Sequence, residues 1–77
     1  MAPIHVIPVG MLRQYTDGQE ALDLEGWAGR PVREMLEDLG IPSPLVGGVL
    51  VGGVLVQKDY RPQDGEEVKL IPLLGGG

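Results

Sequence analysis

The sequence contains no cysteine and no phenylalanine, and it has only one serine, one threonine and one histidine. Without cysteine there can be no disulfide framework, so we expect a small domain that folds without cross-links in the cytoplasm. A nucleophile–histidine–carboxylate site would need His5 beside Ser43 or Thr16, and nothing in the sequence suggests that arrangement. Histidines and carboxylates do not cluster at the spacing of metal ligands, so we expect no metal site. The side chains therefore offer little with which to catalyse a reaction.

Basic residues and long apolar runs are also scarce. Six Lys and Arg residues stand against eleven Asp and Glu residues, which gives a net charge of −5. This balance argues against a nucleic-acid partner, which would require a basic patch, and favours a partner with a basic or neutral face. No run approaches the roughly 18 apolar residues of a membrane span, so we expect no membrane association. With 77 residues, of which 43% are hydrophobic and 4% aromatic, the chain makes one small domain with an aliphatic core.

The first 25 residues predict two antiparallel strands. Residues 3–9 are rich in β-branched side chains, and His5 alternates with apolar neighbours, so we expect it to lie on a strand and to face solvent or a sheet edge. Residues 20–25 also alternate between apolar and polar side chains. Asp17-Gly18 is a strong turn signal between the two segments, and residues 11–12 should form a bend.

A single helix is predicted between residues 31 and 39. Four apolar side chains recur at i, i+3, i+4 and i+7 and form one stripe: Val32, Met35, Leu36 and Leu39. Pro31 suits the first helical turn, and Gly40 suits the left-handed position that closes a helix. Arg30 is a poor N-cap, which leaves the start of the helix open.

The remaining residues predict three strands. Residues 46–56 repeat the pentapeptide VGGVL, and we interpret Gly52-Gly53 as a hairpin turn, with a turn at Gly47-Gly48 as the alternative. Asp64-Gly65 is a further turn signal, and Val68 begins a strand that continues toward Leu74. The order is thus strand, strand, helix and three strands. One helix can cover only one face of a mixed sheet, so the other face stays partly open.

Trp27, Leu73 and Leu74 each admit two interpretations, as a residue packed within the domain or as a contact with a partner. Trp27, the single tryptophan, either packs over the start of the helix, which we favour, or contacts a partner. Leu73 and Leu74 are either the last core residues or an exposed anchor for another protein, and the uncovered sheet face favours the anchor.

The predicted order is that of the β-grasp, or ubiquitin-like, fold of the α+β class. Residues 49–77 resemble the prokaryotic sulfur carriers, which include the small subunit of molybdopterin synthase and the carrier of thiamine biosynthesis. The likeness also covers the helix, so that it extends well over residues 30–77, and it covers the first strands only loosely. The motifs that carry it fall on Gly52-Gly53, Asp59, Asp64-Gly65-Glu66-Glu67-Val68, Leu70-Ile71, Pro72 and Gly76-Gly77. The sequence departs from the family at Gly52, where Asn is usual, at Pro31, where Thr commonly caps the helix, and in having a third terminal glycine.

The resemblance implies a function that resides in the last residue. A partner, an adenylating (E1-like) enzyme that uses ATP, would activate the carboxylate of Gly77, and sulfur would then replace AMP to leave a thiocarboxylate. The protein would be a monomeric carrier rather than an enzyme, would bind no permanent cofactor, and would pass sulfur to a synthase subunit. The resemblance further implies a domain over residues 1–74 and a flexible tail over 75–77. In that tail Gly75 and Gly76 let the backbone enter a narrow active site, while Pro72, Leu73 and Leu74 would contact the partner.

The resemblance leaves the pathway and the acyl acceptor open. The Pro72 ending is closer to the molybdopterin branch than to the thiamine branch. A ubiquitin-like modifier that joins Gly77 to lysines of other proteins would share the adenylation step. An interaction module of the same fold without terminal chemistry is the remaining alternative.

Overall fold

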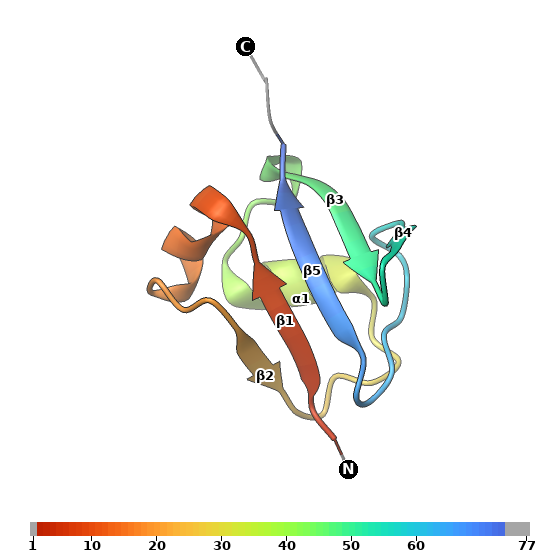
Figure 1. The fold of residues 1–77 in the computed structure, drawn as a ribbon. Coiled ribbons are helices and arrows are strands. Elements are labelled where there is room, and N and C mark those ends of the chain that lie inside the picture. Colours follow the sequence, from red (N-terminus) through yellow and green to blue (C-terminus); the bar gives the residue numbers. More distant parts are fainter. Residues whose placement is uncertain (1, 74–77) are drawn as a thin grey trace.

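The fold is a five-stranded mixed sheet with one α-helix across one of its faces (Figure 1). The structure is a computed structural model that describes residues 2–73. Its elements are β1 (Ile4–Pro8), the 3-10 helix η1 (Gly10–Thr16), β2 (Leu22–Leu24), α1 (Val32–Leu39), the 3-10 helix η2 (Ser43–Leu45), β3 (Val46–Val51), β4 (Val54–Val56) and β5 (Glu67–Pro72). The strand order is β2-β1-β5-β3-β4, in which only β1 and β5 run parallel. This arrangement confirms the β-grasp prediction.

The helix and the inward-facing strand residues form one aliphatic core. Val32, Met35 and Leu36 of α1 are buried and Leu39 is partly buried, so the predicted stripe faces the sheet. Alternate residues of the three central strands meet it from the other side. These strand residues are Ile4 and Val6, Val46, Val49 and Val51, and Val68 and Leu70.

The start of α1 differs from the prediction. Pro31 occupies the N-cap position with extended backbone rather than the first helical turn, and it makes no side-chain cap. The Val32 and Arg33 N–H groups instead donate to the carbonyls of Tyr60 and Lys58, at 3.0 and 2.9 Å. A distant loop therefore satisfies the unpaired donors that every helix start exposes. At the other end Gly40 has φ 73°, as predicted for the residue that closes the helix.

The connection between the first two strands also differs. The expected bend at residues 11–12 is part of η1, a full 3-10 helix with Leu12 buried. Asp17 and Gly18 do turn the chain with positive φ, but they end η1 rather than join two strands directly. β2 covers only residues 22–24, although its antiparallel pairing with β1 is as predicted.

The two glycine doublets of the repeat have different backbone roles. Gly52 and Gly53, with φ of 58° and 81°, form the predicted hairpin turn, across which Val51 pairs with Val54. The alternative turn at Gly47-Gly48 is wrong. Both residues lie within β3, where the register against β5 shifts between the Val46–Pro72 and Gly48–Ile71 pairs. Gly47 is therefore the extra residue of a β-bulge.

Residues 2–73 contain neither a membrane-spanning helix nor a group of metal ligands. No helix there is long and apolar enough to cross a bilayer. Within the same residues, no three His, Asp or Glu side chains gather closely enough to hold a metal ion.

Candidate functional site

The candidate site is the end of β5, from which the chain continues toward its glycine terminus. β5 lies between β1 and β3 in the middle of the sheet, and its end meets the first residues of β3 (Figure 1). The Leu73 N–H donates to the Leu45 carbonyl at 2.8 Å. A Cβ built on Gly10, at the start of η1, would lie 3.7 Å from the Pro72 ring. Pro72 and Leu73, which we call the tail root, thus lie between η1 on one side and the start of β3 on the other.

The residues expected to contact a partner divide into three cases. Leu73 is 56% exposed, so it is not a core residue and its side chain is available at the surface. Pro72 is buried at the end of β5, and its ring lies beside Gly10 of η1. Leu74, Gly75, Gly76 and Gly77 lie outside the described residues.

The sheet face opposite α1 carries apolar side chains next to the tail root. We call Leu50, Leu55, Ile71 and Leu73 the open-face patch. They occupy the outward positions of β3, β4 and β5 and the residue after β5, and Leu50 pairs directly with Leu55. Leu55 is 70% exposed. Leu73 is also exposed, while Leu50 and Ile71 are half-buried. Apolar side chains gathered on an uncovered sheet face often mark a protein contact surface.

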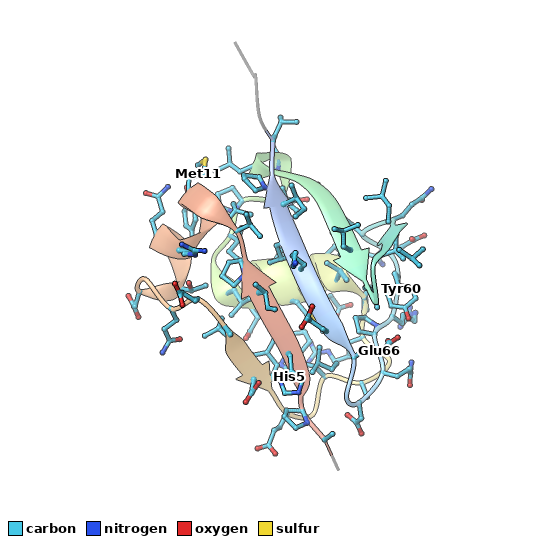
Figure 2. The ribbon with its side chains drawn as sticks, in the orientation of Figure 1. His5, Met11, Tyr60 and Glu66 are labelled. Carbon is cyan, nitrogen blue, oxygen red and sulfur yellow. The ribbon has the colours of Figure 1, made fainter. Side chains whose placement is uncertain are left out.

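The side chains that could have made a nucleophilic site serve separate local structures. His5 projects from β1 on the open face and is hydrogen-bonded to Asp23 of β2 (Figure 2). The hydroxyl of buried Thr16 lies 3.0 Å from the carbonyls of Arg13 and Gln19. His5 therefore faces solvent on a strand, as its alternation predicts.

The loop that caps α1 is itself held by the half-buried carboxylate of Glu66. The Tyr60 hydroxyl donates to Glu66, at 2.9 and 3.0 Å from its two oxygens, and the Gln63 N–H donates to the same carboxylate at 2.8 Å (Figure 2). The hydrogen bond to Glu66, then burial and the negative charge of Glu66, raise the pKa of Tyr60. Sequence reasoning missed this pair, because no local pattern connects Tyr60 to a residue beyond the Asp64-Gly65 turn.

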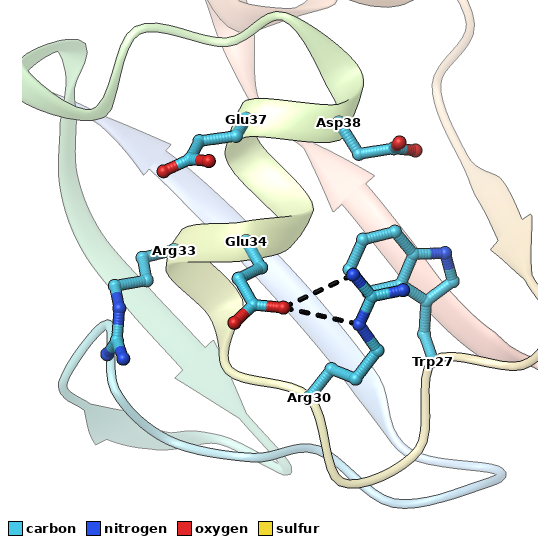
Figure 3. A pocket seen from close by; sticks show the side chains of 6 residues that line it. All are labelled: Trp27, Arg30, Arg33, Glu34, Glu37 and Asp38. Atoms are coloured by element: carbon cyan, nitrogen blue, oxygen red, sulfur yellow. Dashed lines mark hydrogen bonds and ion pairs between the residues drawn. The ribbon is translucent and has the colours of Figure 1, made fainter.

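A shallow hollow lies on the outer side of α1. The Arg30 guanidinium stacks on Trp27, 3.8 Å from the ring centre, and its Nε and Nη2 donate to Glu34 at 3.2 Å (Figure 3). Arg33, Glu37 and Asp38 complete the lining. Trp27 is 9% exposed and belongs to the core cluster, which confirms the packing interpretation. The arginine already occupies the aromatic face, so the hollow offers a ligand only exposed charges of mixed sign.

Comparisons with solved structures reveal the same fold in archaeal proteins. The Haloferax volcanii HVO 2177 protein superposes with a TM-score of 0.77 at 19% identity, covering 99% of this chain and 87% of that one. SAMP1 from Haloferax volcanii gives 0.71 at 18% identity, with 99% and 100% coverage. A putative molybdopterin converting factor, subunit 1, from Pyrococcus furiosus gives 0.68 at 20% identity, with 94% and 98% coverage.

The sequence comparison with protein families gives a match over most of the chain. No curated protein matches the sequence. The sequence model of the family described as Mut7-C ubiquitin matches residues 13–75, which include the helix, the repeat, the whole of β5 and its continuation. The fold and this match confirm the resemblance to ubiquitin-like proteins at the level of the family. The chain belongs to the Mut7-C ubiquitin family.

Proposed function

We propose that the protein is a sulfur carrier, in which a partner enzyme adenylates the carboxylate of Gly77 and sulfur then converts it to a thiocarboxylate. The observation that supports this most is the end of β5. A strand in the middle of the sheet ends at an exposed Leu73, and the sequence continues from there as Leu-Gly-Gly-Gly. The thiocarboxylate would donate sulfur in cofactor biosynthesis, with a molybdopterin-type acceptor favoured over a thiamine-type one.

The chemistry needs a carboxylate and no catalytic side chain from this protein. A Gly77 carboxylate oxygen attacks the α-phosphorus of ATP and expels pyrophosphate, and the resulting acyl adenylate has AMP as a good leaving group. The terminal sulfur of a persulfide attacks the acyl carbon and expels AMP. A thiol then cleaves the S–S bond, which leaves the thiocarboxylate on Gly77 and the persulfide carrier as a disulfide. Partners supply ATP, the persulfide and the thiol.

In this proposal the folded domain contributes recognition. The open-face patch, which includes Leu73, presents apolar surface to the adenylating enzyme, and later to a sulfur-accepting synthase subunit. Glycines at positions 75–77 allow the backbone to approach the reactive groups closely, because no side chain blocks either side. Binding energy from the domain can then position the acyl carbon for reaction.

A ubiquitin-like modifier is the second candidate, favoured by the ubiquitin-like family itself. It would use the same adenylate but pass the acyl group to a lysine amine of another protein. The two differ in the product found in cells. Intact-mass measurement of the free protein would show one oxygen exchanged for sulfur in a carrier, whereas a modifier would appear in conjugates linked through Gly77.

The test is ATP–pyrophosphate exchange by the adenylating enzyme of the same organism. Adding one residue after Gly77 moves the carboxylate about 3.3–3.6 Å. Misplacement of about 1 Å can cost roughly 100-fold, so we expect exchange to fall by at least roughly 100-fold. The free energy of unfolding serves as the control and should not change. Absence of carrier-dependent exchange in the wild type would rule out terminal acyl chemistry. Equal exchange by the wild-type and extended forms, without removal of the added residue, would show that the position of the carboxylate is not critical.

A further inference from the structure

Gly47 allows an unusually close approach between two strands. A Cβ built at this position would lie 2.9 Å from the Leu73 Cα, 3.2 Å from the Leu73 nitrogen and 3.3 Å from a methyl carbon of the same residue. Gly47 is not among the glycines with positive φ, so its backbone suits any residue. Glycine is required here because there is no room for a Cβ. The two nearest opposing atoms belong to the Leu73 backbone and cannot rotate away.

The close approach occurs where the chain leaves the sheet. Gly47 is the bulge residue of β3, next to the Val46–Pro72 pair that ends β5. The Leu73 N–H reaches past it to the Leu45 carbonyl at 2.8 Å, one hydrogen bond beyond the end of the strand. The bulge and this hydrogen bond together hold Leu73 against the beginning of β3.

We propose that Gly47 is a positioning residue for the C-terminal tail, which fixes the place and direction in which the chain leaves the domain. The proposal rests on the function proposed above. Residues 74–77 span at most about 13–14 Å when fully extended, so the reach of Gly77 depends on where its root lies. A domain docked on an adenylating enzyme can deliver the carboxylate accurately only if the root is held in place.

The sequence itself supplies a matched control in Gly48. A Cβ there would meet the Leu55 Cδ1 at 3.4 Å and the Ile71 Cβ at 3.8 Å, which is ordinary contact with side chains. Gly47→Ala and Gly48→Ala therefore add the same methyl group to adjacent residues of the same strand. Only the first pushes on the backbone of Leu73.

The first measurement is amide hydrogen exchange, which does not depend on the function of the protein. In Gly47→Ala the Leu73 amide should exchange roughly 5- to 10-fold faster, as expected for the loss of one hydrogen bond. The amides of Val68 and Leu70, in the centre of β5, should keep their wild-type rates. Gly48→Ala should leave Leu73 unchanged. Equal Leu73 exchange in both variants would overturn the proposal.

The second measurement is the kinetics of ATP–pyrophosphate exchange with carrier concentration varied. Gly47→Ala should lower kcat by roughly 10-fold, given that 1 Å can cost roughly 100-fold. KM should change much less, because Leu50, Leu55 and Ile71 of the docking surface are not displaced. Gly48→Ala should keep the wild-type kcat. A wild-type kcat in Gly47→Ala with faster Leu73 exchange would overturn the role in positioning. Absence of exchange in the wild type would overturn the proposed function, whereas the hydrogen-exchange result would still report on the Leu73 contact.

A second pair of variants tests the same root without altering β3. Leu73→Pro removes the N–H that donates to Leu45, and Leu73→Ala removes the same side chain but keeps the donor. We expect kcat to be lower in the proline variant than in the alanine variant, by a factor like that of Gly47→Ala. Equal kcat values in this pair would overturn the proposal even if Gly47→Ala failed to fold.

Discussion

Single residues of the α1 stripe hold the helix on the sheet. Leu36 is 1% exposed and packs at the middle of the helix, while Met11 on η1 is 45% exposed. Both side chains are large and apolar, so the two residues differ in burial and not in hydrophobicity. Their replacement should therefore have very different costs.

For Leu36→Ala we expect the free energy of unfolding to fall by about 2–5 kcal/mol, from lost burial and the cavity that remains. Such a loss is a large part of the stability of a small domain. Urea denaturation gives the value directly. Met11→Ala is the control and should change stability by no more than about 0.5 kcal/mol. Equal effects of the two variants would mean that the stripe is not core.

The Tyr60–Glu66 pair gives a prediction about pH. Since the folded state raises the pKa of Tyr60, the neutral phenol is favoured, and its contribution to stability is complete below the unfolded pKa of about 10. This contribution is lost as pH rises through the folded pKa. The ultraviolet difference titration between wild type and Tyr60→Phe should therefore have its midpoint above about pH 10. Glu66→Gln, which removes the charge, should bring the midpoint back toward that value; an unchanged midpoint would contradict the assignment.

At the level of elements, the repeat in residues 46–56 produces a strand, a bulge and a turn. The hairpin needs positive φ at Gly52 and Gly53, and β3 requires an empty side-chain position at Gly47. The Gly-Gly dipeptide is thus needed for its positive φ angles at residues 52–53, and for its lack of a side chain at residue 47.

Gly53→Ala should lower the free energy of unfolding by about 1–2 kcal/mol, the cost of a left-handed conformation for a residue with a Cβ. Gly52→Asn should cost far less, because Asn-Gly is a favoured pair for this type of hairpin turn. Urea unfolding of the two variants tests the turn. A loss in Gly52→Asn as large as that in Gly53→Ala would argue against the left-handed geometry.

At the scale of the whole molecule, the proposed docking surface and the proposed tail root share only Leu73. The open-face patch lies on the side of the sheet opposite α1, and the tail leaves from the end of β5. Changes to the patch should therefore affect binding, and changes to the tail or its root should affect the reaction step.

Replacing Leu55 by Ser should raise KM for the adenylating enzyme by roughly 5-fold or more, the loss expected of an interface residue worth at least about 1 kcal/mol. Because Leu55 is exposed, stability should change by no more than about 0.5 kcal/mol. Glu37→Ser, on the exposed side of α1, is the matched control and should leave KM unchanged. A normal KM in Leu55→Ser would remove the patch from the docking surface.

Most of the fold could be predicted from local patterns, while much of the candidate site could not. The alternation in residues 3–9, the stripe of α1 and the Gly52-Gly53 turn are each encoded within a few consecutive residues, since helix and strand periods differ. The 3-10 helix η1 was not predicted, because its Leu12 is buried only through contacts with the rest of the core, which no local pattern reveals. The glycine terminus pointed to the end of β5, but nothing in it indicated what holds that end.

The sequence by itself determined the order of strands and helix, the aliphatic core and the identity of the residues at the terminus. Backbone preference and hydrophobic period act over short distances along the chain, so they can be read without a fold. The tertiary structure alone decided that the Tyr60 and Lys58 carbonyls cap α1, that Pro72 is buried while Leu73 is exposed, and that Gly47 admits the Leu73 backbone. Each of these depends on contact between segments far apart in the chain, and such contacts exist only once the sheet has brought those segments together.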